Sequence, residues 1–223
     1  FVLFDSSKNQ YQLYNREMSE QRVSPNSTYK IYSALFALES NVISTTSNSQ
    51  IWDGTVHPYP EWNQNQNLAT ALSRSVNWYF QNTDREVGRK LLQDYFHKIK
   101  YGNEDLSGNL ESYWMESSLK ISPIEQVQLL YQLEENQWGF KAENIKAVKK
   151  ALLIDEQKNG RLYGKTGTGM VNGKNVNGWF IGFVDKGDDR FYFAINIQNK
   201  DGQAQGSKAA EIAKQILHQK KIY

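Results

Sequence analysis

The stretch Ser24-Pro25-Asn26-Ser27-Thr28-Tyr29-Lys30 governs the interpretation of this sequence, because it sets a serine and a lysine three residues apart. The apolar run IYSALFAL at residues 31–38 follows at once and predicts a largely buried helix. Asn26 is a favourable N-cap residue for that helix. Residues three apart on a helix share one face, so we expect the Lys30 amine to reach the Ser27 hydroxyl.

Two further motifs follow in a fixed order: Ser75-Val76-Asn77 and then Lys165-Thr166-Gly167-Thr168. The set S-x-x-K, S-x-N and K-T-G is typical of proteins whose active-site serine is acylated by β-lactams. Each piece alone is weak, and S-x-x-K occurs again at Ser117-Ser118-Leu119-Lys120, where we take it to be coincidental. The order carries the interpretation, with the first motif before an apolar helix and the last after a predicted strand.

Composition excludes several classes of protein. The chain has 223 residues and a formal net charge of +2, with no dense basic run, so we expect no nucleic-acid partner. It contains no cysteine, which excludes disulfides and thiolate metal sites, and no stretch of 18 apolar residues. The opening residues Phe1-Val2-Leu3-Phe4 predict a β-strand that begins at the first residue of the sequence. A natural amino terminus rarely begins in this way, so we expect an excised domain.

The pattern along the chain predicts strands, then helices, then strands and a final helix. Residues 1–4 and 11–15 predict a β-hairpin. The predicted helices are 68–81, 85–99, 122–135, 141–154 and 207–219, and the later predicted strands are 161–164, 178–184 and 190–197. The turns between them are assigned to Gly160, to the segment 169–177 and to residues 186–189.

This order of elements predicts an α+β fold, an α/β sandwich in one domain over residues 1–223. We expect an antiparallel sheet of about five strands flanked by terminal helices, with the two ends of the chain meeting in the sheet. The sheet region would take residues 1–49 and 156–223. The helical region, inserted between these parts, would take residues 50–155.

The first two motifs supply the parts of a nucleophilic mechanism. A serine hydroxyl attacks only when a neighbouring base takes its proton, and Lys30 is the candidate base for Ser27. A lysine can do this only if burial or a second cation lowers its pKa, and Lys165 would be that cation. Ser75 would relay a proton to the leaving nitrogen. Asn77 is assigned to the binding of the substrate.

The K-T-G segment would bind the substrate and the oxyanion. Lys165 and Thr166 would hold a substrate carboxylate, while Gly167 lets the backbone come close. The backbone N–H groups of Ser27 and Thr168 would form the oxyanion hole.

Other chemistries find less support. His57, His97 and His218 lie in separate predicted segments without metal-ligand spacing, so no metal is predicted. A Ser-His-Asp triad stays open, since triads assemble in space, although no G-x-S-x-G is present. Gly164-Lys165-Thr166 looks like the end of a phosphate loop, but Asn159 stands where that loop needs a glycine.

With further segments, the chain resembles the penicilloyl-serine transferase superfamily and, within it, the class D branch. These marks are Tyr101-Gly102-Asn103, Tyr113-Trp114 and Gly178-Trp179-Phe180-Ile181-Gly182. More closely, it resembles the extracellular sensor domain of BlaR/MecR-type β-lactam receptors over essentially its whole length. That resemblance rests on residues 24–32, on Pro58-Tyr59-Pro60-Glu61-Trp62-Asn63 and on Ser75-Val76-Asn77-Trp78-Tyr79-Phe80.

The resemblance implies a serine β-lactamase/D,D-peptidase fold. It also implies that carbon dioxide can convert Lys30 to a carbamate that activates the deacylating water, with Trp114 as its hydrogen-bond partner. No other cofactor is implied. Class D hydrolases similarly carry Phe where Tyr29 stands and usually an apolar residue where Asn77 stands. An amide beside Lys30 could stabilise the free amine and so lower the population of the carbamate, which would leave the acyl group in place. Alternatively, the amide caps a helix turn and contacts the substrate.

Two functions therefore stay open, with a third behind them. The first is a β-lactam sensor, acylated at Ser27, whose long-lived acyl form signals the induction of resistance; whether it counts as an enzyme depends on its turnover. The second is a class D β-lactamase that hydrolyses β-lactams. A D,D-peptidase would leave the class D marks unexplained. As a sensor, the domain would lie on the extracellular face of the plasma membrane, with penicillins or cephalosporins and the rest of its own receptor chain as partners.

Overall fold

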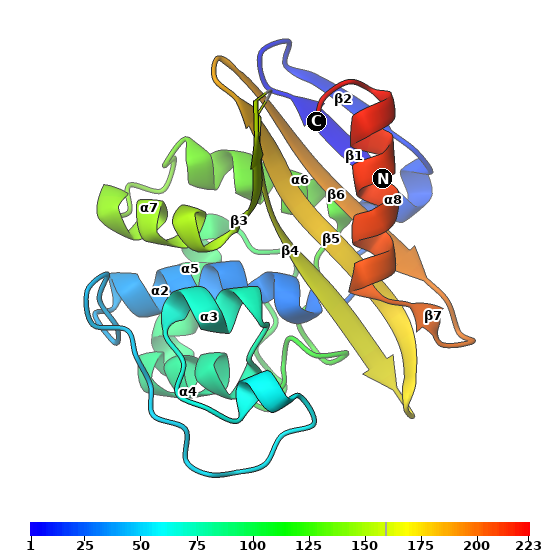
Figure 1. Ribbon diagram of the computed structural model, residues 1–223. Coiled ribbons are helices and arrows are strands. Elements are labelled where there is room, and N and C mark those ends of the chain that lie inside the picture. Colours follow the sequence, from blue (N-terminus) through cyan, green and yellow to red (C-terminus); the bar gives the residue numbers. More distant parts are fainter. Residues whose placement is uncertain (159) are drawn as a thin grey trace.

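Both ends of the chain contribute strands to one sheet (Figure 1). The computed structural model describes residues 1–158 and 160–223. The strands are β1 (Val2–Asp5), β2 (Gln10–Leu13), β3 (Leu153–Gln157), β4 (Gly160–Val171), β5 (Lys174–Lys186), β6 (Asp189–Gln198) and β7 (Gln203–Ala204). They lie in the order β2-β1-β6-β5-β4-β3, while β7 pairs with β5. β1 pairs antiparallel with β6, so the predicted meeting of the two chain ends is confirmed.

The predicted number of strands was too low. Over the described residues the sheet has seven strands rather than about five, and the β5–β7 pair is parallel. Strand β3 is exposed along its whole length, and β7 has only two residues. Neither shows the alternation of buried and exposed residues by which a strand is recognised in sequence. The α+β class and the mostly antiparallel sheet are confirmed.

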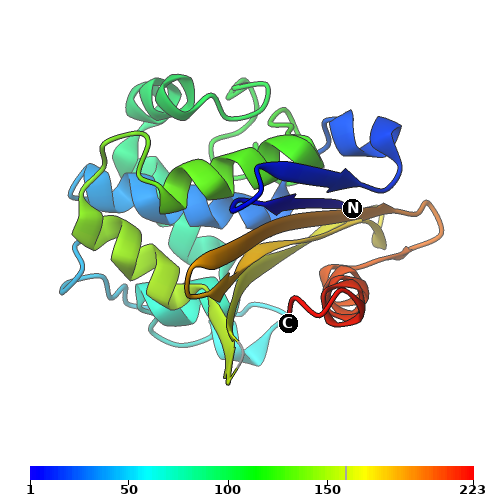
Figure 2. The ribbon, with the colours of Figure 1, turned by 90° about the horizontal axis from the view of Figure 1, so that it is seen from above.

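The sheet separates two hydrophobic cores. Side chains alternate along β5, so Trp179, Ile181 and Phe183 face the helical region while Phe180 and Val184 face the other way. The second face is covered by α8 (Gly206–Gln219), through Ala209, Ala213 and Leu217. Figure 2 shows α8 alone on this side and the other long helices on the opposite side.

The helical side holds most of the helices (Figure 1). They are α1 (Arg16–Glu20), α2 (Lys30–Glu39), α3 (Leu68–Ser73), α4 (Asn77–Val87), α5 (Arg89–Ile99), α6 (Pro123–Glu134) and α7 (Ala142–Ala151), with short 3₁₀ turns η1 (Asn26–Tyr29) and η2 (Pro60–Trp62). Helix α2 is buried over nearly its whole length, as its apolar sequence predicts. Across the described residues, no helix is long and apolar enough to cross a membrane.

The predicted helix 68–81 is wrong, because the chain breaks between α3 and α4. The Val76 N–H donates to the Ala71 carbonyl at 2.9 Å and the Ser75 N–H donates to the Leu72 carbonyl at 3.2 Å. These two bonds form a Schellman cap, which needs a left-handed residue, and Ser75 takes that conformation with φ 57°. Glycine is the usual signal for this cap, and here a serine replaces it. A second break, at Gly88, divides the predicted helix 85–99.

Two predicted boundaries of secondary-structure elements also differ from those in the structure. Asn26 is not an N-cap: it opens η1 with φ 50°, and its side chain makes other contacts. The segment 169–177, predicted as a turn, is mostly strand, because β4 continues to Val171 and β5 begins at Lys174. The turn is only Asn172-Gly173, and both residues have positive φ, as a type I′ hairpin requires. The K-T-G motif therefore lies inside β4 rather than after a strand.

Candidate active site

The Lys30 amine is the centre of the candidate site. It opens α2 and is completely buried. Its Nζ lies 3.0 Å from Ser27 Oγ, 2.6 Å from the Ser75 carbonyl oxygen and 2.5 Å from Asn77 Oδ1. The aromatic rings of Trp62, Phe80 and Trp114 surround it at 5.0 to 5.9 Å. Sequence reasoning had not assigned the first two rings to this site.

Burial lowers the pKa of Lys30 well below its ordinary value, and the nearby charge of Lys165 lowers it further. Both causes predicted from the sequence are present. Burial also lowers the pKa of Lys165 to about 7. Both effects favour the uncharged amine of Lys30, which is the form that can accept a proton.

A neutral amine has two protons and one lone pair, and the geometry indicates where each points. The Ser75 carbonyl oxygen and Asn77 Oδ1 can only accept hydrogen bonds, so both amine protons are directed to them. The lone pair is then left for the third close neighbour, Ser27 Oγ. The arrangement is suited to the removal of the Ser27 proton.

Ser75 links the two lysines. Its Oγ accepts a hydrogen bond from Lys165 Nζ at 2.7 Å and lies 3.5 Å from Lys30 Nζ. The left-handed conformation at Ser75 allows this, because the Schellman cap brings both its carbonyl and its hydroxyl to the site. Lys165 Nζ is also held by the Thr166 carbonyl at 3.0 Å.

Strand β4 passes directly beside the start of η1. A Cβ on Gly167 would lie 3.0 Å from the Pro25 carbonyl and 3.3 Å from the Ser27 nitrogen, so a side chain here would push the two segments apart. The Gly164 N–H donates to the Leu152 carbonyl on the β3 side. Because N–H directions alternate along a strand, the Thr168 N–H points to that same side, beyond the described residues that pair with β3. This direction fits a donor to a bound carbonyl.

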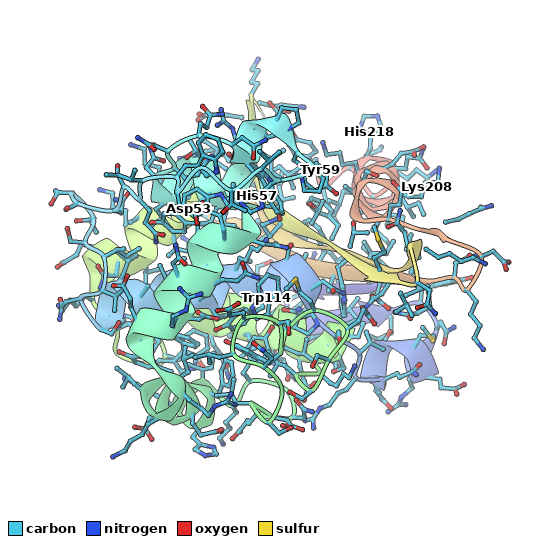
Figure 3. The ribbon with its side chains drawn as sticks, turned by 90° about the horizontal axis from the view of Figure 1, so that it is seen from below. Asp53, His57, Tyr59, Trp114, Lys208 and His218 are labelled. Atoms are coloured by element: carbon cyan, nitrogen blue, oxygen red, sulfur yellow. The ribbon has the colours of Figure 1, made fainter. Side chains whose placement is uncertain are left out.

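Asn77 and Trp114 complete the pocket around Lys30. Asn77 is the first residue of α4, and its Nδ2 contacts Met115 Sδ at 3.4 Å. Trp114 is completely buried, and within the described chain its Nε1 has no hydrogen-bond partner. Figure 3 shows Trp114 in the interior between the helices and the sheet, whereas His57 lies on the loop before α3 and His218 on α8.

The second S-x-x-K segment lies elsewhere. Lys120 Nζ donates to Ser24 Oγ at 2.8 Å. The lysine of this segment therefore has a structural partner outside the Lys30 pocket.

Sequence reasoning missed a buried cluster behind the site, in which hydroxyl groups surround a single carboxyl. Asp84 accepts hydrogen bonds from Ser33 Oγ at 2.6 Å and from the Tyr113 hydroxyl at 2.7 Å, and the Tyr113 and Tyr29 hydroxyls are 2.5 Å apart. Burial raises the pKa of Asp84 to about 7. The cluster accounts for the tyrosine at position 29. A signal existed: Asp84 lies two helical turns after Asn77, on the buried face of α4.

This sheet, with a serine and a buried lysine at one edge, defines a class of proteins that share one fold and one kind of active site. The chain belongs to the penicillin-binding protein transpeptidase domain family, whose pattern matches residues 3–218. It is 48% identical, over its whole length, to the regulatory protein BlaR1 of Bacillus licheniformis, and 43% identical to the methicillin resistance mecR1 protein of Staphylococcus aureus.

A solved structure agrees with these relatives. The C-terminal domain of the Bacillus licheniformis BlaR penicillin-receptor is 47% identical, with a TM-score of 0.95, and the match covers 100% of this chain and 89% of that domain. The predicted resemblance to this receptor type is confirmed, as is the class D β-lactamase-like fold. The chain spans 37% of the length of BlaR1 and 38% of that of mecR1.

Proposed function

We propose that this chain is the β-lactam-sensing part of a receptor. A β-lactam acylates Ser27, the acyl group persists, and the acylated form signals the induction of resistance. The observation that carries the proposal is the hydrogen-bonding of Lys30 Nζ, which is poised toward Ser27 and tied to Asn77. The similarity to a regulatory protein, a methicillin resistance protein and a penicillin-receptor domain supports it.

In the acylation step, the Lys30 lone pair takes the Ser27 proton as Oγ attacks the lactam carbonyl. The C–N bond of the ring then breaks, and Ser75 passes a proton to the leaving nitrogen. Its Oγ has both lysines within 3.5 Å, so a proton can reach it from either. Lys165 and Thr166 bind the substrate carboxylate. The Ser27 and Thr168 N–H groups stabilise the oxyanion.

Asn77 is assigned a second role, in keeping the acyl group attached. A carbamate on Lys30 would need donors, and the Trp114 N–H, which has no partner among the described residues, fits one of its oxygens. Asn77 Oδ1, however, is an acceptor at 2.5 Å from Nζ, where it stabilises the free amine instead. When the carbamate on Lys30 is lost, no base is left to activate water for deacylation.

The receptor context is supported by the same relatives. Because the chain matches the C-terminal domain of a penicillin-receptor and spans little more than a third of BlaR1 and mecR1, we assign it to the extracellular, ligand-facing part of a membrane-anchored receptor. The remainder of that receptor chain would then be its signalling partner.

The alternative is a class D β-lactamase with turnover. The Trp114 N–H, for which residues 1–158 and 160–223 offer no hydrogen-bond partner, favours it. A tenfold excess of chromogenic cephalosporin separates the two. We expect one equivalent of colour and then a plateau, with a stable mass adduct that Ser27→Ala abolishes. Complete consumption of the cephalosporin would establish the hydrolase. An adduct on Ser27→Ala at normal yield would remove Ser27 from the mechanism.

A further inference from the structure

The residue before the candidate nucleophile has a strained backbone. Asn26 has φ 50°, which costs a non-glycine residue stability unless its surroundings hold it. The peptide unit that joins Asn26 to Ser27 carries the Ser27 N–H. Because that unit is planar, the conformation of Asn26 fixes the direction of this N–H.

The short segment from Trp114 to Glu116 holds Asn26 at both its backbone and its side chain. The Asn26 N–H donates to the Trp114 carbonyl at 2.9 Å, and Asn26 Nδ2 donates to Glu116 Oε1 at 2.8 Å. Asn26 is 2% exposed, whereas Glu116 is half-buried. Glu116 itself has φ 44°, so the residue that makes the contact is also held in a strained conformation.

The same Glu116 oxygen also binds the sheet. It accepts a second hydrogen bond, at 2.7 Å, from Asn177 Nδ2 on β5. Asn177 is the register partner of Gly169 on β4, the residue directly after Thr168. A Cβ on Gly169 would lie 2.0 Å from Glu116 Oε1 and 2.6 Å from Asn26 Nδ2, so the carboxylate lies against the strand backbone.

Glu116 thus links η1, which carries the Ser27 N–H, to β5, and it packs against Gly169 of β4, directly after the second oxyanion donor, Thr168. We propose that Glu116 is a positioning residue that sets the relative placement of these two donors through Asn26 and Asn177. The inference rests on the proposed acylation of Ser27. Glu116 acts through its neighbours, so its loss slows the chemical step and leaves the initial recognition of the substrate carboxylate by Lys165 intact.

The test is stopped-flow acylation by penicillin, which separates the dissociation constant of the first complex from the acylation rate constant. We expect Glu116→Ala to lower the rate constant between 10-fold and 10²-fold, approaching the loss of one oxyanion donor, with the dissociation constant changed less than about twofold. Glu116→Gln keeps an acceptor oxygen and should stay within about threefold of the parent. Glu111→Ala is the matched control, because Glu111 is in the same loop but pairs with Arg85.

Two other variants reach the same contact from its other sides. Asn26→Gly tolerates the positive φ but removes the tether, so it should slow acylation as Glu116→Ala does. Gly169→Ala should displace both the Glu116 carboxylate and the Asn26 amide and should therefore slow acylation. These variants carry the test if thermal melting shows that Glu116→Ala does not fold.

The outcomes separate this inference from the proposed function. Parent-like acylation of Glu116→Ala and Asn26→Gly, with Ser27→Ala inert, overturns the positioning role alone. Glu116→Gln as slow as Glu116→Ala overturns it too, since the charge and not the hydrogen bonds would then matter. Labelling of Ser27→Ala overturns the proposed function itself.

Discussion

At the scale of single residues, the proposal of a sensor rather than a hydrolase depends on Asn77. Asn77→Val would remove the acceptor at 2.5 Å from Lys30 Nζ and dry the pocket, which favours the carbamate. We expect deacylation to become faster, most clearly in added bicarbonate, so that the variant acts as a weak β-lactamase. The measurement is the decay of the acylated mass peak with and without bicarbonate. Equal lifetimes of parent and variant in bicarbonate would show that Asn77 does not hold the acyl group in place.

The two lysines should fail in different ways. Lys30→Ala removes the base and should slow acylation by roughly 10²-fold or more. Lys165→Ala should chiefly weaken the first complex, because a charge-assisted contact to the carboxylate is lost. It also removes a charge that lowers the pKa of Lys30, so the pH profile of acylation should move to higher pH. Stopped-flow rates between pH 5 and 9 measure both effects. A Lys30→Ala rate equal to that of the parent would exclude lysine as the base.

At the scale of elements, the residue that is best for stability at the break between α3 and α4 differs from the residue that is best for acylation. A glycine at position 75 suits φ 57° better than any other residue, whereas a serine there supplies the Oγ that accepts the hydrogen bond from Lys165. We expect Ser75→Gly to be more stable than Ser75→Ala by about 1 kcal/mol. Both should acylate about 10²-fold more slowly than the parent. Thermal melting and acylation kinetics on the pair test this, and normal acylation of Ser75→Gly would contradict the relay role.

The same break shows what could be predicted from the sequence. The apolar run of α2 and the alternation of β5 have strong periodicities, so their elements were predicted. The break at Ser75 and the turn at Asn26 carry no glycine signal, because residues with roles in the site take the strained conformations. The motif residues were predicted as a group, whereas Glu116, Asp84 and Trp62 were missed, since their positions depend on contacts between distant segments. The assignment of residues 1–223 to one domain stays a prediction.

At the scale of the whole molecule, buried Asp84 should make stability depend on pH. Its pKa is raised by burial from 3.8 to about 7, so between these values the folded chain keeps a proton that the unfolded chain has lost. The free energy of unfolding therefore falls as pH rises through this window, by roughly 1.4 kcal/mol per pH unit at most. Asp84→Asn removes this titration. Relative to the parent, its melting temperature should rise by roughly 5 °C or more between pH 5 and pH 8.

The control for this prediction is Asp94→Asn, which changes an exposed carboxyl on the neighbouring helix α5. Its melting temperature should follow that of the parent across the pH range. Lys30 and Lys165 are present in all three proteins, so their titrations cancel in the comparison. Parallel pH profiles for Asp84→Asn and the parent would show that Asp84 does not keep its proton in the folded state.

Thr168 connects the edge of the sheet at the site with the face that α8 covers. Its backbone N–H points to the site, while its Oγ1 accepts a hydrogen bond at 2.9 Å from the Gly206 N–H, where α8 begins on the other face. An alanine scan would therefore misjudge this position. Thr168→Ala keeps the backbone donor and unties the start of α8, so the scan would report a packing defect. The share of Thr168 in the chemistry would show only after replacement of its peptide nitrogen by an ester oxygen, a change that leaves the hydroxyl and the C-terminal helix in place.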